Sequence, residues 1–174
     1  METKYLVDLG AALIPLVVGY IWYHPKLLGS VLKASGDVNA EKMQSGHAWW
    51  VYPVAFVASY YIARSLGSIT IHQYGLLSML ANQPDVHVAG TPLNTVVQGL
   101  LDKYGENYRT FKHGALHGSL TGVYFVLPIL TFITIFEKKK WTYLAIHASY
   151  WIICLALMGG VVCAYMPTHI QLAH

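Results

Sequence analysis

Residues 111–137 read FKHGALHGSLTGVYFVLPILTFITIFE, and this stretch decides the fold. No charged side chain occurs from Gly114 to Phe136. A helix over these residues is about 35 Å long, which exceeds the roughly 30 Å of a bilayer's hydrocarbon core. Glycine recurs at every fourth position, and so do two histidines at 113 and 117. Both spacings place the repeated side chains on one face of a helix, so the stretch is predicted to be a membrane span.

The composition of the whole chain agrees with a membrane protein. Of the 174 residues, 55% are hydrophobic and 11% are charged, whereas soluble domains carry about 25% charged residues. The mean hydropathy is +0.44. The net charge of +3 is small and the basic residues form no long run, which argues against a nucleic-acid partner. Two cysteines do not make a disulfide framework.

The apolar runs predict an all-α, integral membrane four-helix bundle made of a single domain over residues 1–174. Its four transmembrane helices are expected at residues 5–23, 48–66, 114–136 and 141–165. The first run lacks a small-residue cleavage site, so it is predicted to be an uncleaved span. Pro128 is expected to kink the third span, on which the other three are expected to pack.

Two connections carry structure of their own. Residues 26–33 place apolar side chains on one side between two lysines, as in a short interfacial helix. Within the long connection 67–112, Thr91 is a helix cap, Pro92 opens an amphipathic helix and Gly105 ends it. Residues 67–84 fit either an extension of span two or a re-entrant segment.

Lysine density predicts the orientation. Four spans put the loop after span one and the turn Lys138–Lys139–Lys140 on the same side of the membrane. Basic residues in short loops mark the cytoplasmic side, so both termini are expected outside the cell.

The glycine face of span three is predicted to be a packing surface. Gly114, Gly118 and Gly122 leave room for close backbone contact, which drives helix association in lipid. Span one, with Gly19 on a face of small residues, is the expected partner. At Gly118, leucine is expected to force the helices apart, while alanine is expected to be tolerated.

The histidine pair of span three is the candidate metal site. His113 and His117 lie one helical turn apart and can chelate one ion, but zinc sites use three or four protein ligands. Asp8, His169 or a loop histidine would have to complete the set. The alternative is structural: His113 in the headgroup layer and His117 in a hydrogen bond between helices.

Several segments together resemble a known family. IWYHPKLLG closes span one, glycines run through span three, Pro128 and the Phe136–Glu137 turn follow, and MGG stands near the end of span four. In this order they resemble small bacterial four-span membrane proteins catalogued as domain of unknown function 1761. The resemblance implies a four-helix domain of the bacterial inner membrane and assigns no catalytic residue. The histidine pair and the long 67–112 connection depart from the family pattern.

Three functions fit these observations. The leading interpretation is a non-catalytic accessory or structural subunit that works through a homo-oligomer or a larger complex in the lipid bilayer. A small solute carrier or channel is the second. The third is a histidine-based metal-binding protein or a metal-dependent membrane enzyme, with a divalent metal as cofactor. No nucleophile triad, phosphate loop or carboxylate pair supports catalysis.

Overall fold

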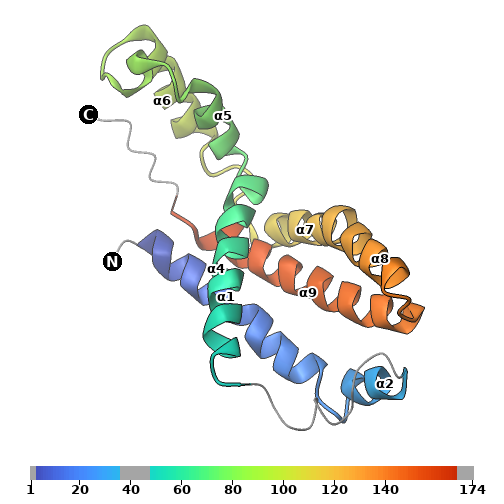
Figure 1. Ribbon diagram of the computed structural model, residues 1–174. Coiled ribbons are helices and arrows are strands. Elements are labelled where there is room, and N and C mark those ends of the chain that lie inside the picture. The colour runs from blue at the N-terminus through green and yellow to red at the C-terminus, as the bar shows by residue number, and fades with distance from the viewer. Residues whose placement is uncertain (1–2, 36–47, 168–174) are drawn as a thin grey trace.

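The computed structural model describes residues 3–35 and 48–167. The regular secondary structure in these residues is all helical, as predicted. Figure 1 shows the helices in chain order. Their bounds are α1 (Thr3–Trp22), α2 (Leu28–Ser35), α4 (Val51–Thr70), α5 (Gln73–Leu80), η1 (Pro84–His87), α6 (Pro92–Tyr104), α7 (Phe111–Thr121), η2 (Gly122–Val126), α8 (Leu127–Phe136) and α9 (Trp141–Tyr165).

Long apolar helices fit a multi-pass membrane protein. In the described part of the chain, three helices are long and apolar enough to cross a membrane: Thr3–Trp22, Phe111–Phe136 and Trp141–Tyr165. Helix α4 becomes a fourth span if it is counted together with α5. These two are bent by 87° at their junction, and α4 itself continues to Thr70 before the chain turns.

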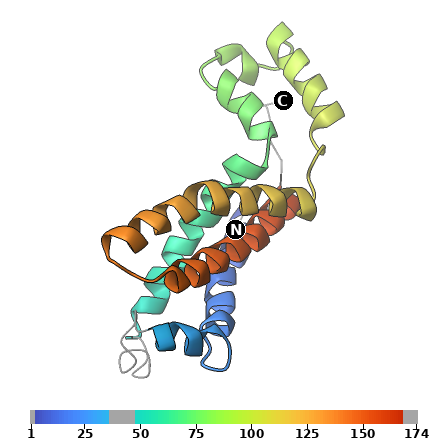
Figure 2. The same ribbon diagram turned by 90° about the vertical axis from the view of Figure 1, so that its right-hand side faces the viewer.

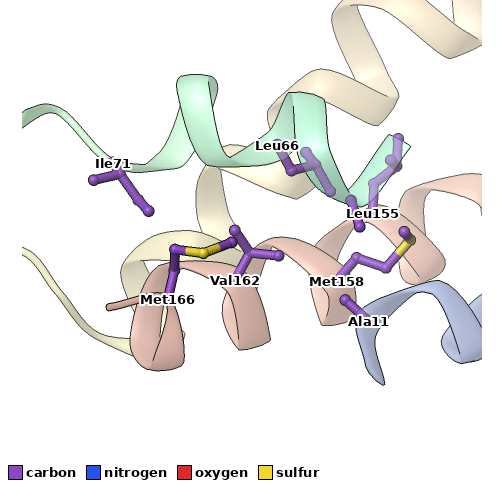
Figure 3. Close-up of a cluster of buried hydrophobic side chains, with 8 residues drawn as sticks. Ala11, Leu66, Ile71, Leu155, Met158, Val162 and Met166 are labelled. Atoms are coloured by element: carbon purple, nitrogen blue, oxygen red, sulfur yellow. The ribbon is translucent and has the colours of Figure 1, made fainter. Parts of the chain in front are cut away.

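Helix α9 is the central helix, which corrects the prediction that the other spans pack on span three. In the most apolar stretch of α9, 50% is buried inside the protein. The corresponding share for the Phe111–Phe136 helix is 11%. It packs against α1, α4 and α7. Figure 3 shows one such contact, where Met158 and Val162 of α9 meet Ala11 of α1 and Leu66 of α4. A helix that is apolar on all sides is expected at such a buried position.

The glycine face of α7 packs on α9, not on span one. A Cβ atom added at Gly114 or Gly118 would overlap the carbonyl oxygens of Gly159 and Leu155. At Gly122 an added Cβ would come within 2.8 Å of Ile152. The three glycines therefore lie at a close contact with α9, and span one is not their partner.

Span one also packs on α9 through its small residues. The Cβ of an alanine at Gly19 would lie 3.2 Å from the Tyr150 hydroxyl. That hydroxyl donates a hydrogen bond of 2.8 Å to the carbonyl of Pro15. A buried tyrosine therefore fills the space that the small residues leave open, and its polar end is satisfied.

A π-helical turn precedes Pro128. Leu127 donates its amide hydrogen to the carbonyl of Gly122, five residues back, and η2 covers Gly122–Val126. Proline lacks an amide hydrogen and crowds the preceding turn, so the helix widens there. The expected distortion at Pro128 thus takes the form of a π turn between α7 and α8.

The long connection between spans two and three forms an outer arm, residues 73–104, that projects from the bundle in both views (Figures 1 and 2). Helix α6 matches its prediction: the Thr91 side chain accepts from the amide of Asn94, and Gly105 follows the last turn. Val86 and Val97 form a small core with five leucines: Leu76, Leu77, Leu80, Leu93 and Leu101. The arm therefore has a core of its own.

Candidate metal site

The first turn of α7 sets the position of two histidines. The Thr110 hydroxyl caps the helix by accepting from the amide of His113 at 3.3 Å. His117 follows one turn later, and the two ring centroids lie 4.5 Å apart. The sequence spacing therefore produces the paired rings that it predicts.

A third histidine reaches this pair from the junction of α4 and α5. His72 lies directly after Ile71, whose backbone is extended and ends α4. The His72 ring centroid is 5.0 Å from that of His113 and 5.1 Å from that of His117. The bend between α4 and α5 thus brings a residue 41 positions earlier in the chain to the same point as His113.

The three rings present their nitrogens to one another. One ring nitrogen from each of His72, His113 and His117 lies within 4.8 Å of the other two. The Nε2 atoms of His72 and His113 are 2.9 Å apart, so one of them carries the shared proton. Zn–N bonds of about 2.05 Å in tetrahedral geometry separate two ligand nitrogens by about 3.3 Å. Small ring movements are enough to reach that arrangement.

The cluster lies at a boundary, not in the interior. His72 is exposed, and His113 and His117 are partly buried. His113 and His117 belong to the first two turns of the Phe111–Phe136 helix. An ion bound there would be held by the protein on one side and remain open to solvent on the other.

Of the two further ligands considered from the sequence, Asp8 is not part of this cluster. The Asp8 side chain is fully buried and pairs with Arg64, whose Nη1 lies 3.2 Å from its carboxylate. It therefore links α1 to α4 and does not join the histidines. His169 lies outside the described residues.

Tyr108 completes the surroundings of the site, and sequence reasoning missed it. Its ring lies 5.1 Å from that of His113 and 6.3 Å from that of His72. Its φ of 62° is in the left-handed region, which is unfavourable for a bulky residue. The ring covers one side of His113, and no sequence signal marks this conformation.

The comparisons with known proteins identify a family. A family model described as "Protein of unknown function (DUF1761)" matches residues 7–163. The chain belongs to this family. The resemblance expected from the segment order is thus confirmed, and the match to DUF1761 includes all three clustered histidines but not His169.

No curated protein and no solved structure matches this DUF1761 chain. Its family carries no described function.

Proposed function

We propose that this DUF1761 protein binds a divalent transition-metal ion at one end of its membrane spans, through His72, His113 and His117. The observation that supports it is the approach of three ring nitrogens to within 4.8 Å. Two of these histidines come from one helix, and the third comes from the α4–α5 junction. Three histidines that converge from distant parts of the chain indicate a metal site more specifically than two histidines spaced one turn apart on a helix.

The donor set selects the class of ion. All three donors are imidazole nitrogens, which suit zinc, copper, nickel and iron. Mg²⁺ and Ca²⁺ prefer oxygen donors, so they are not the expected ions. Three protein ligands leave a fourth position in a tetrahedral site, and His72 is the exposed member of the three. We expect water or an exchangeable ligand at that position.

The cluster favours binding over catalysis. Among the described residues its members are all histidines, so the group itself contains no carboxylate that could act as a general base. Binding an ion requires only these donors, whereas a reaction would also require a substrate site, so we propose a binding protein as the function.

The other two interpretations have less support. A cavity of about 380 Å³ between α4, α7, η2 and α9 is lined mostly by apolar side chains, which gives no support to an ion channel. An accessory role in a homo-oligomer or larger complex remains a second proposal. It is favoured by the outward apolar side chains of α6, where Val96 is 61% exposed.

We also propose that the metal site faces the outside of the cell. The three consecutive lysines lie at the turn between α8 and α9, at the opposite end of the Phe111–Phe136 helix from His113. The positive-inside rule assigns that turn to the cytoplasm, which places both termini in the outer space.

Metal content of the purified protein tests the proposed function. The full chain, prepared without a histidine tag and stripped with EDTA, is dialysed against equal Zn²⁺, Cu²⁺, Ni²⁺, Mn²⁺ and Mg²⁺ and then analysed by elemental mass spectrometry. We expect one transition-metal ion per chain. His72→Ala, His113→Ala and His117→Ala should each reduce that content, because two remaining imidazoles hold an ion more weakly.

Two further variants control for nonspecific binding. His87 is an exposed histidine of the arm outside the cluster, so His87→Ala should keep the full metal content. His169→Ala tests whether His169, a further ligand considered from the sequence, contributes to metal binding. Equal metal loss in the His87 and His117 variants, or no bound transition metal in the wild type, would refute the proposed function.

A further inference from the structure

The metal site lies at the two points where the outer arm joins the bundle. The first connection is Ile71–His72, between α4 and α5. Ile71 is buried in the bundle core with Leu66 and Val162, while the next side chain, His72, belongs to the metal cluster. The 87° bend between the two helices is therefore located at a metal-ligating residue.

The second connection runs from Gly105 to Thr110 and reaches the same site. Tyr108 in this segment places its ring beside His113 and His72. Its carbonyl, like that of Thr70 at the end of α4, lies 3.4 Å from the buried thiol of Cys163 in α9. Both connections thus contact the same residue of the central helix.

One side chain links the two connections to each other. The Gln73 amide nitrogen donates to the carbonyls of Tyr104 and Asn107, at 3.2 and 3.0 Å. Gln73 directly follows His72, and Asn107 directly precedes Tyr108. Gln73 therefore joins the residue beside His72 to the C-terminal end of the arm and to the second connection.

The arm itself holds together independently of the bundle. Val86 and Val97 form its core, and the Asn94 amide donates to the Val86 carbonyl at 2.9 Å. Because this core lies within residues 73–104, the orientation of the arm depends on the two connections.

We propose that metal binding fixes the outer arm against the membrane bundle, so that the arm reports metal occupancy outside the membrane. This inference rests on the proposed metal site. A hydrogen bond between the Nε2 atoms joins His72 to His113 of α7. Coordination by three histidines exists only in the arrangement that holds His72 against α7. An ion therefore shifts the population toward that arrangement, since it binds it more tightly than any other.

The test measures the distance from arm to bundle with and without metal. Spin labels are attached at Val96→Cys on α6 and Leu13→Cys on α1, both exposed positions remote from the cluster. The native cysteines are fully buried, which protects them from the label. Pulsed electron–electron double resonance is recorded in nanodiscs, first with EDTA and then with Zn²⁺, which is diamagnetic. We expect a broad distance distribution with EDTA and a single narrow one with Zn²⁺.

Variants separate this inference from the metal site itself. In His72→Ala and His117→Ala the distribution should no longer respond to Zn²⁺, and the His117 variant leaves both connections unaltered. His87→Ala should respond like the wild type. If bound zinc is found in the same sample and the distribution does not change, the arm proposal is wrong and the metal site stands. If no zinc binds, both proposals fail.

Discussion

Asp8 is the residue whose environment is least expected in a membrane span. It is fully buried within α1, and its second carboxylate oxygen has no hydrogen-bond partner among the described residues. Arg64 of α4 supplies the ion pair, and its side chain is 49% exposed. The two partners are thus unequal. The buried Asp8 carboxylate depends on the ion pair, whereas the Arg64 side chain is half exposed and does not.

This inequality predicts an asymmetric effect of mutation. Arg64→Ala leaves a buried carboxylate without a partner and should lower the free energy of unfolding by about 3 kcal/mol. Asp8→Ala leaves a half-exposed guanidinium and should cost about 1 kcal/mol. Thermal unfolding in detergent, followed by tryptophan fluorescence, measures both.

The double variant Asp8→Leu/Arg64→Met is the matched control, because replacing both charges with apolar groups is often neutral. We expect it to melt close to the wild type. A lower melting temperature for Asp8→Ala than for Arg64→Ala would show that the carboxylate does not depend on this pair.

At the scale of elements, the contact between α7 and α9 is the closest that glycine makes possible between two helices in the described part of the chain. Gly114 and Gly118 face Gly159 and Leu155, with no space for a methyl group. Alanine at Gly118 must therefore push the helices apart, contrary to the tolerance expected from the sequence.

Gly118→Ala should destabilise the protein by about 2–3 kcal/mol, the upper part of the usual range for overpacking. Gly10→Ala is the control within a span, since no atom lies within 4 Å of its added Cβ. It should melt at or slightly above the wild-type temperature, because alanine favours helix over glycine. Equal melting temperatures for the two variants would place α7 away from α9.

Local signals and long-range packing differ in how well the sequence predicts them. Thr91, Pro92 and Gly105 act within one helix, so the bounds of α6 follow from the sequence alone. The partner of the glycine face depends on which helices meet, and nothing in residues 111–137 specifies that. A signal was present in α9: Gly159 and Gly160 lie in a long helix without charge, which is the composition of a central helix.

In the proposed metal site, too, the local part follows from the sequence and the long-range part does not. One turn of helix brings His113 and His117 together, and this follows from their spacing. The sequence places His72 on the same side of the membrane but does not show that the α4–α5 bend aims its ring at them. The left-handed backbone of Tyr108 is likewise set by tertiary contacts.

At the scale of the whole molecule, the proposed orientation places the arm and the metal site in the same outer space. A single added cysteine at Asn107, beside the site, should react with an impermeant maleimide on intact cells. One at Glu137, in the turn before α9, should react only after permeabilisation. Both positions are exposed, so accessibility in the fold does not separate them. The opposite labelling pattern would invert the orientation and place the site in the cytoplasm.

The central claim is that three histidines from two distant segments hold one ion. X-ray absorption at the zinc edge of the loaded, tag-free protein tests it most directly, because it counts the donors around the metal. We expect three imidazole nitrogens at about 2.0–2.1 Å from the zinc and one further light donor. In His72→Ala the imidazole count should fall by one. A shell dominated by oxygen or sulfur, or a spectrum unchanged in His72→Ala, would contradict it.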